Sequence, residues 1–234
     1  MNAQSASCRL IRYAGVFPWL LAVAILLTAS NSTIANPPQD ARGGAQGAYD
    51  YFALALAWAP TLCLESPGSE ECSWRHHGGF VVEGLWPQKD FDSPVNCTLQ
   101  RPLTDALINS MLDLMASPAR VTQEWLRHGT CSGLEPAAYF ALMRKVYESV
   151  ALPDLSSIAN DTSQSTQTIT NAFRHLDHGL PPQAVIVSCS MLDAPRLREV
   201  FICVDARYLG SFYCKGELLR RTCKSLTLLV SPIR

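Results

Sequence analysis

The sequence predicts an α+β domain in which a central antiparallel sheet packs against helices and four disulfides tie the fold together. Segments with strand periodicity lie toward both ends of the domain, and segments with helical periodicity lie between them. The third observation is the cysteine count: the chain has nine, of which Cys8 lies in an N-terminal segment that we expect to be removed. The remaining eight form an even set, which behind an export signal indicates disulfides made in an oxidising compartment.

That N-terminal segment has the order of a secretory signal peptide. Arg9 and Arg12 precede an apolar run from Val16 to Leu27, and small polar residues follow up to Ala35. The run is shorter than the roughly 20 residues that a membrane-spanning helix needs. We therefore expect export of the chain, to the periplasm or the medium, and no membrane contact after cleavage. The expected organisation is a signal peptide over 1–35, a flexible leader over 36–48 and the folded domain over 49–234.

The domain divides into predicted elements by periodicity and by its turn residues. Alternating or short apolar runs predict strands at 51–58, 80–82, 184–190, 200–205, 212–213 and 226–230. Apolar residues at helical spacing predict helices at 103–115, 122–127, 136–150 and 168–176. We expect Pro118 to end the first helix, Thr122 to cap the second with Gly129 beyond its end, and Pro136 to lie in the first turn of the third. Residues 61–79, with Cys63 and Cys72, and the polar stretch before 168 should be loops.

Charge limits how the domain could bind a polyanion. The chain has 19 basic and 20 acidic residues, and loss of the two arginines in the signal leaves 17 against 20. A near-neutral protein cannot hold nucleic acid over a broad cationic face, so any such binding must be local, in a groove. The cysteines lack Cys-x-x-Cys spacing and the histidines lack ligand spacing, so we expect no metal site.

The segment from Gln123 to Cys131 is the strongest candidate for chemistry. If it is helical, Glu124 and His128 share a face because they are four residues apart, and Arg127 lies beside them. An imidazole transfers protons near neutral pH, and a cation neutralises charge that develops on a phosphate. From spacing alone, however, an ordinary solvated pair on a helix surface is the favoured interpretation.

Three segments in order, taken together, resemble the ribonuclease T2 family. Gln-Glu-Trp-Leu-Arg-His-Gly-Thr-Cys at 123–131 is similar to the family's second active-site signature, His-Glu-Trp-x-Lys-His-Gly-Thr-Cys. Val-Glu-Gly-Leu-Trp-Pro at 82–87 is similar to the first, Ile/Val-His-Gly-Leu-Trp-Pro, and 56–63 resembles the strand that ends in Trp-x-Pro-x-x-Cys. The resemblance covers essentially all of the chain after the signal. It implies the disulfides Cys63–Cys72, Cys97–Cys131, Cys189–Cys223 and Cys203–Cys214.

The resemblance also implies an activity. Members of this family cleave single-stranded RNA with little base preference and need no metal or cofactor, and we expect a monomer. The ribose 2′-hydroxyl attacks the adjacent phosphate, which leaves a 2′,3′-cyclic phosphate and a free 5′-hydroxyl. By this resemblance His128 is the general base, Glu124 and Arg127 stabilise the phosphorane, and Trp86 stacks on a base unless it packs in the core.

Three positions depart from the family pattern. Arg127 replaces lysine, Gln123 replaces a phosphate-binding histidine, and Glu83 replaces the catalytic histidine of the first signature. A protonated Glu83 could serve as the general acid opposite His128, or the two could exchange roles. Alternatively, a charged Glu83 would repel the phosphate, and loss of an acid–base partner costs roughly 10²–10⁴-fold in rate.

Two other classes of protein therefore remain open. One is an RNA-binding protein on the same scaffold with impaired turnover, which the replacements Glu83 and Gln123 favour. The other is a secreted inhibitor or structural protein unrelated to RNA, which only the export signal and the cysteines favour. None of the remaining histidines is expected to replace the missing one, since each is predicted to lie on the surface: His76, His77, His175 and His178.

Overall fold

The computed structural model describes residues 49–69, 72, 79–89, 91–98, 101–177 and 179–233. These residues belong to one of the two units into which the chain divides, Pro38–Arg234. The predicted signal peptide and flexible leader lie outside the described residues, as do three of the histidines expected on the surface, at 76, 77 and 178. The structure therefore tests the prediction for the folded domain, over 49–234.

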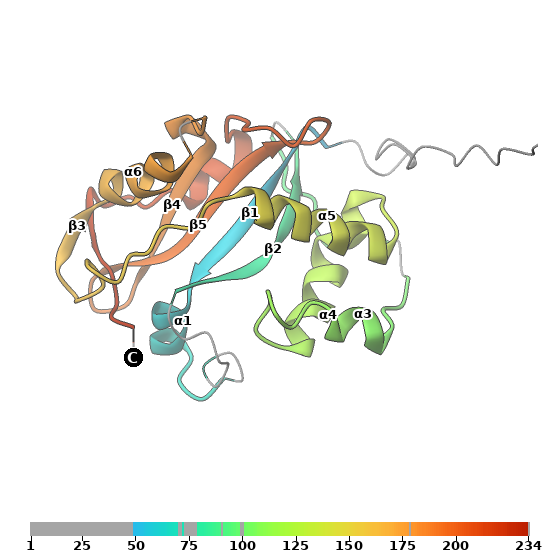
Figure 1. Cartoon of the computed structure of the whole chain (residues 1–234), viewed down its shortest axis with the longest axis horizontal. Coiled ribbons are helices and arrows are strands. Elements are labelled where there is room, and N and C mark those ends of the chain that lie inside the picture. Colours follow the sequence, from blue (N-terminus) through green and yellow to red (C-terminus); the bar gives the residue numbers. More distant parts are fainter. Residues whose placement is uncertain are drawn as a thin grey trace, which may run out of the picture. The chain divides into compact units, whose positions relative to one another are not determined.

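The described residues form the α+β arrangement that the sequence predicts (Figure 1). The strands are β1 (Tyr51–Trp58), β2 (Phe80–Gln88), β3 (Ser163–Ser165), β4 (Val185–Met191), β5 (Pro195–Asp205) and β6 (Thr227–Leu229). The helices are α1 (Ala59–Glu65), α3 (Asp105–Asn109), α4 (Pro118–Arg127), α5 (Pro136–Ser149) and α6 (Thr166–Leu176). Short 3₁₀ helices are η1 (Gly129–Ser132), η2 (Pro182–Ala184) and η3 (Gly216–Arg221).

The six strands form one sheet with the order β2-β1-β5-β6-β3, and β4 pairs with β5 beside this path. Every strand pair is antiparallel except β5 with β6, which is parallel. The sheet is therefore antiparallel in every pair but one, which agrees with the predicted central antiparallel sheet and adds one parallel pair at β6. The long connection between β5 and β6, which contains η3, is what allows these two strands to run in the same direction.

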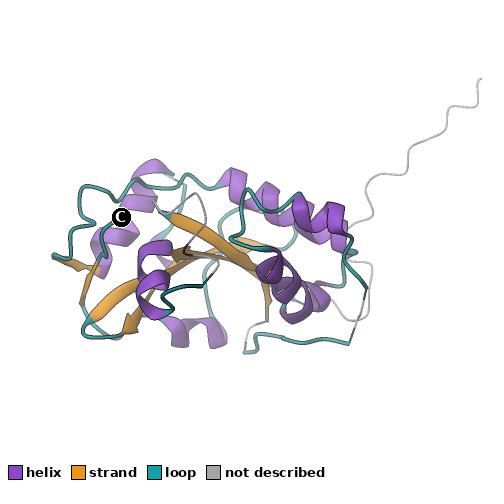
Figure 2. Cartoon of the chain, turned by 90° about the horizontal axis from the view of Figure 1, so that it is seen from below, coloured by secondary structure: helices purple, strands orange, loops and turns teal. Residues whose placement is uncertain are grey.

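Strand β1 is buried on both faces and separates two groups of core side chains. Its residues Phe52, Leu54, Leu56 and Trp58 belong to the main core, together with side chains of α4, α5 and α6. In the views of Figures 1 and 2, these helices pack around the twisted sheet. The opposite face of β1 carries Tyr51 and then small alanines, which leave room for large side chains of the neighbouring strands.

The first part of the domain differs from the prediction at two elements. The expected loop at 61–79 starts with a helix, α1, because Pro60 at its first turn has the fixed φ that favours helix initiation. The strand predicted at 80–82 runs on through the Glu-Gly-Leu-Trp-Pro motif to Gln88. Prolines and short polar residues mark element boundaries here, as predicted. Pro60, however, marks the start of a helix where a loop was expected.

The expected helix over 103–115 is limited to α3, and turns follow it. Pro118 does not end that helix but begins α4, as the first-turn proline that helices tolerate. The cap of α4 is Ser117, whose side chain accepts a hydrogen bond from the backbone N–H of Arg120 at 3.3 Å. The predicted cap, Thr122, lies inside the helix and bonds the carbonyl of Pro118 instead.

The second half follows the prediction more closely. Helices α5 and α6 and strands β4, β5 and β6 lie where periodicity placed them, within a few residues at each end. Two short segments are exceptions: 212–213 is not a strand, and part of the polar stretch before α6 forms β3. All four disulfides that the family resemblance implies are present: Cys63–Cys72, Cys97–Cys131, Cys189–Cys223 and Cys203–Cys214. None of the helices in the described part of the chain has the length and apolar character needed to cross a bilayer.

Candidate active site

One cavity of about 230 Å³ brings together every side chain that the sequence singles out for chemistry. Strand β2 contributes Glu83 and Trp86, and the end of α4 contributes the others, Gln123, Glu124, Arg127 and His128. Four further residues line the same cavity and were not selected from the sequence: Arg120, Arg198, Glu199 and Arg221. The two signatures, about forty residues apart in the chain, therefore form a single site.

His128 lies where α4 ends, and its backbone N–H donates to the Glu124 carbonyl at 2.9 Å. Its side chain is buried, and its ring stacks on Trp86 with centroids 4.6 Å apart and an interplanar angle of 14°. Burial, together with the charges of Arg127 and Arg221, lowers the pKa of His128 to about 3. The imidazole is therefore neutral over the acidic and neutral range.

The Nδ1 atom of His128 is buried without a hydrogen-bond partner among the described residues. A buried polar atom without a partner costs about 1–3 kcal/mol, so such atoms are rare and often functional. Trp86 contributes to this environment because it packs on His128, and the guanidinium of Arg221 lies 4.8 Å from the indole ring. Trp86 is thus a packing partner of the histidine, and its contact with a base stays a prediction.

Glu124 is a buried carboxyl group that connects three elements. Its Oε1 accepts the backbone N–H of Leu85 at 3.0 Å and lies 2.6 Å from the Tyr139 hydroxyl. Gly84 leaves the space for this carboxyl, because a Cβ at that position would lie 2.0 Å from Oε1. A larger residue than glycine in the Glu-Gly-Leu-Trp-Pro motif would therefore displace Glu124.

The hydrogen-bond pattern indicates that Glu124 is protonated. The Tyr139 hydroxyl also lies 2.7 Å from the Leu85 carbonyl, which can only accept. Since a phenol has one hydrogen, both of its contacts can be hydrogen bonds only when Glu124 carries a proton. This agrees with burial, which raises the pKa of Glu124 to about 8 against the opposing effect of its hydrogen bonds. Glu124 is thus a neutral group at acidic and neutral pH.

Glu83 is the extra residue of a β-bulge in β2. Val82 pairs with Leu56 and Gly84 pairs with Ala55, so Glu83 stands between two consecutive pairs of the ladder. Bulges re-aim a side chain and are common beside active sites. Here the Glu83 carboxylate points into the cavity, where its Oε1 lies 3.3 Å from Nη1 of Arg198.

The lining carries an excess of positive charge. Four arginines, at 120, 127, 198 and 221, face two carboxyl groups, Glu83 and Glu199, while Glu124 is neutral. The chain as a whole has a formal charge of -1, so its cationic character is concentrated locally here. A groove of this kind suits a phosphodiester, because guanidinium groups match phosphate oxygens in geometry and charge.

Three of the four residues that sequence reasoning missed come from the last third of the chain, and the fourth, Arg120, lies in α4 just before the second signature. Arg198 and Glu199 lie in β5 and Arg221 in η3, far along the chain from both signatures. One signal was available: Arg198 and Glu199 are charged residues that directly precede the apolar run 200–204 in a buried strand. His175, by contrast, is exposed at the end of α6, as predicted.

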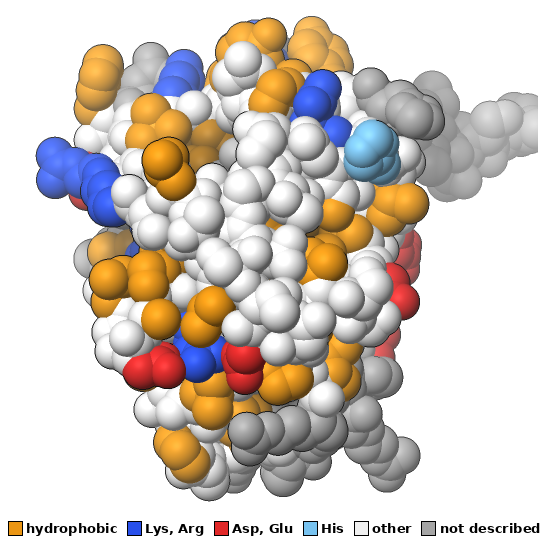
Figure 3. Space-filling view, turned by 90° about the vertical axis from the view of Figure 1, so that its left-hand side faces the viewer, with side chains coloured by type: hydrophobic (Ala, Val, Ile, Leu, Met, Phe, Trp, Pro, Cys, Tyr) orange, Lys and Arg blue, Asp and Glu red, His pale blue; other side chains and the backbone are white. Residues whose placement is uncertain are grey.

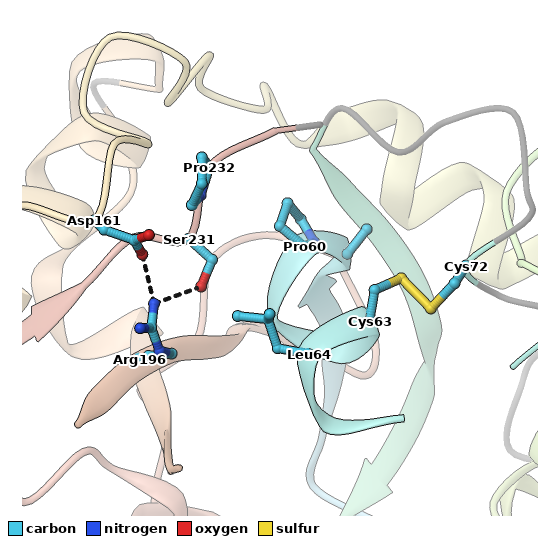
Figure 4. Close-up of a pocket in the computed structure, with 9 residues that line it drawn as sticks. Pro60, Cys63, Leu64, Cys72, Asp161, Arg196, Ser231 and Pro232 are labelled. Atoms are coloured by element: carbon cyan, nitrogen blue, oxygen red, sulfur yellow. Dashed lines mark hydrogen bonds and ion pairs between the residues drawn. A yellow bond between two sulfur atoms is a disulfide. The ribbon is translucent and has the colours of Figure 1, made fainter. Parts of the chain in front are cut away.

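A larger cavity of about 430 Å³ contains none of the predicted residues (Figure 4). Its Arg196 is held by ion pairs with Asp161 and Asp193 and by a hydrogen bond to the Ser231 hydroxyl at 3.3 Å, so the guanidinium stabilises the surrounding chain. The molecular face drawn in Figure 3 shows hydrophobic side chains in small separate groups and few charges. Neither region offers the concentration of titratable groups found in the smaller cavity.

The fold and the site define one class of protein. It is a small disulfide-bonded domain whose arginine-rich cavity can hold a phosphate group and surrounds one neutral histidine. A profile described as the ribonuclease T2 family matches residues 49–214. This match covers well over half of the chain, and the chain therefore belongs to the ribonuclease T2 family.

Individual relatives agree with this assignment. A protein named ribonuclease from Aeromonas hydrophila is 30% identical over 207 residues, which cover 82% of this chain and 89% of that protein. Among solved structures, an RNase-related protein from Calystegia sepium superposes with a TM-score of 0.60 at 22% identity, covering 80% of this chain and 98% of the other. Ribonuclease MC1 from bitter gourd seeds gives 0.59 at 21% identity and covers 77% of this chain and 100% of the other. At such identities the structural matches establish the fold.

Proposed function

We propose that this protein is a secreted endoribonuclease that cleaves single-stranded RNA with low base specificity through 2′,3′-cyclic phosphates. The observation that carries the proposal is the cavity in which neutral His128, the Glu83 carboxyl and four arginines meet. Family membership and the Aeromonas ribonuclease support the same reaction class. Low base specificity follows from a lining that is dominated by phosphate-binding groups.

The reaction needs one group that takes a proton and one that gives it. The neutral ring of His128 accepts the proton of the ribose 2′-hydroxyl, and O2′ then forms a bond to phosphorus. The bond between phosphorus and O5′ breaks, and the leaving O5′ takes a proton from Glu83. Solvent afterwards restores both groups to their starting protonation states. An incoming phosphate anion also raises the basicity of His128, because a nearby negative charge favours the imidazolium form.

The arginines stabilise the charge that develops on the phosphorane oxygens. Arg127 replaces the usual lysine with a planar fork that can bind two oxygens at once, and Gln123 beside it retains a hydrogen-bond donor. A neutral Glu124 would not repel the phosphate. No metal or cofactor takes part in this scheme.

Incubation of the purified protein with homopolymer RNAs between about pH 4 and about pH 7 tests the proposal, with products identified by phosphorus NMR. We expect cyclic phosphates from every homopolymer with the wild type and none with His128→Ala. The matched control is His175→Ala, since this second histidine is exposed on α6 and lies outside the cavity. Cleavage that persists in His128→Ala would overturn the proposed role of that ring.

The second candidate is an RNA-binding protein of the same fold with impaired turnover. It is favoured by the ion pair between Glu83 and Arg198, since a carboxylate that stays ionised cannot act as an acid. In that case RNA is retained in a gel-shift assay while no cyclic phosphate forms, and Glu83→His gains activity. A protein that neither binds nor cleaves RNA would remove both candidates.

We further propose that residues 1–35 are a signal peptide and that the exported protein is a monomer in the periplasm or the medium. The four disulfides support export, because such bonds persist in oxidising compartments. N-terminal sequencing of the protein recovered from outside the cytoplasm should begin just after Ala35, and size-exclusion chromatography should give the mass of one chain. Recovery with an intact N-terminus from the membrane fraction would contradict export by cleavage.

A further inference from the structure

Glu199 is a buried carboxyl group in the cavity to which the reaction described above gives no role. Its side chain is 8% exposed, and its Oε1 lies 3.5 Å from Nη1 of Arg198. The same Nη1 contacts Oε1 of Glu83 at 3.3 Å, so one guanidinium nitrogen lies against both carboxyl groups. The other oxygen of Glu199 lies 3.6 Å from Arg221.

A second β-bulge produces this arrangement. Ser188 pairs with Glu199 and Cys189 pairs with Leu197, so Arg198 is the extra residue of β5 opposite β4. In a regular strand, Arg198 and Glu199 would point to opposite faces because side chains alternate. The bulge instead lets both line the same cavity. The bulges at Glu83 and Arg198 therefore bring two acids, Glu83 and Glu199, into one cavity with the guanidinium group that both contact.

The two acids lie beside one another and away from solvent. The carboxyl groups of Glu83 and Glu199 contact the same guanidinium nitrogen of Arg198, at 3.3 Å and 3.5 Å, and their side chains are 12% and 8% exposed. Close carboxyl pairs of this kind retain one proton to higher pH because both cannot ionise cheaply.

We infer that Glu199 is a positioning residue for catalysis, which shares one proton with Glu83 and thereby keeps Glu83 able to protonate the leaving oxygen. This inference rests on the proposed function. The ion pair to Arg198 does not prevent this role: Arg198, which also pairs with Glu65, and Arg221 together balance the single negative charge of the pair, while the shared proton remains available. Burial and the charge of Glu83 raise the pKa of Glu199 to about 7, which is the direction expected for such a pair.

Charged groups surround the pair from several elements. Glu65 at the end of α1 forms an ion pair with Arg198 from the far side, and Arg221 of η3 contacts Glu199. The remaining titratable groups that line the cavity are His128 and Glu124, which are both neutral, and the arginines of α4. The cations favour ionisation, whereas burial and the second carboxyl group oppose loss of the last proton.

The pH dependence of kcat/KM for RNA cleavage tests the inference. In the wild type, activity should fall at neutral pH as the pair loses its proton. In Glu199→Gln, Glu83 faces the arginines without a second negative charge, so this fall should move to lower pH by at least about one unit, with an activity loss of about tenfold at neutral pH. A merely structural role would lower activity equally at all pH values. The control is Glu217→Gln, which removes an exposed carboxylate paired with Arg220 and should leave the profile unmoved.

A titration that does not depend on activity separates this inference from the proposed function. Carbon-13 labelling of the glutamate carboxyl groups should reveal, besides the signal that is lost in Glu124→Gln, a carboxyl that ionises near neutral pH, and its pKa should fall in both Glu83→Gln and Glu199→Gln. If the wild type cleaves no RNA but this coupled titration is seen, the proposed function fails and the carboxyl pair stands. If RNA is cleaved, the profile of Glu199→Gln matches the wild type and the two carboxyls titrate independently, the inference is overturned.

Discussion

Replacement of Glu124 by glutamine should change how stability depends on pH. Burial raises the pKa of this carboxyl from 4.5 to about 8. Because the folded-state pKa is above the unfolded value, the favourable contribution of this group is complete below the unfolded pKa and is lost as pH rises through the folded one. At about 1.4 kcal/mol per pKa unit, the loss amounts to about 5 kcal/mol across that window. A glutamine at position 124 is neutral at every pH, so the variant does not lose this stability as pH rises.

Urea unfolding of both proteins at a series of pH values measures this difference. The stability of Glu124→Gln relative to wild type should rise by several kcal/mol between about pH 5 and about pH 9, most of it below neutral pH. The comparison cancels the contributions of the other titrating groups in the cavity, which are the same in both proteins. Glu148→Gln on α5, an exposed site, should show a constant difference. A constant difference for Glu124→Gln as well would refute a buried neutral carboxyl.

Three further predictions follow from the packing. Gly84→Ala should destabilise the fold by about 1–3 kcal/mol, because the new methyl group would overlap a buried carboxyl, and an unchanged melting temperature would contradict this. Trp86→Ala should expose the stacked ring and raise the pKa of His128 from about 3 toward its ordinary 6.5 in a proton NMR titration, whereas a pKa that does not move would show that Trp86 is not what buries the ring. Removal of the Cys97–Cys131 disulfide by a double alanine substitution should cost about 4 kcal/mol in chemical unfolding, since the bond closes a loop with a sequence separation of 34, and a loss below about 1 kcal/mol would refute that estimate.

Much of the fold follows from local patterns in the sequence. The apolar alternation of β1 and the helical spacing in α5 and α6 specify their elements because one face of each must be buried. The predicted element boundaries were wrong where one residue type fits two different structures. Pro118 fits both the end of a helix and the first turn of the next, and only the Ser117 cap and the packing of Val121 and Trp125 decide between them.

The sequence predicted the signature residues that line the cavity, but not the residues of β5 and η3 that line it with them. Both motifs were found, and Glu83 was recognised as the position that departs from the family. The positions of Arg198 and Glu199 depend on two β-bulges and on strand pairing across the sheet, which no local pattern encodes. The small residues of β1 were similarly ambiguous, because alanines in a buried strand do not indicate which large side chains pack over them.

The most direct test of the account compares RNA with a substrate in which sulfur replaces the bridging O5′ atom. A thiolate leaves without being protonated, so this substrate does not need a general acid. We predict that Glu83→Gln loses roughly 10²–10⁴-fold in kcat/KM on ordinary RNA and recovers nearly all of it on the sulfur substrate, while His128→Ala stays defective on both. An equal loss on the two substrates in Glu83→Gln would show that the carboxyl group does not deliver the proton, and the account would be wrong.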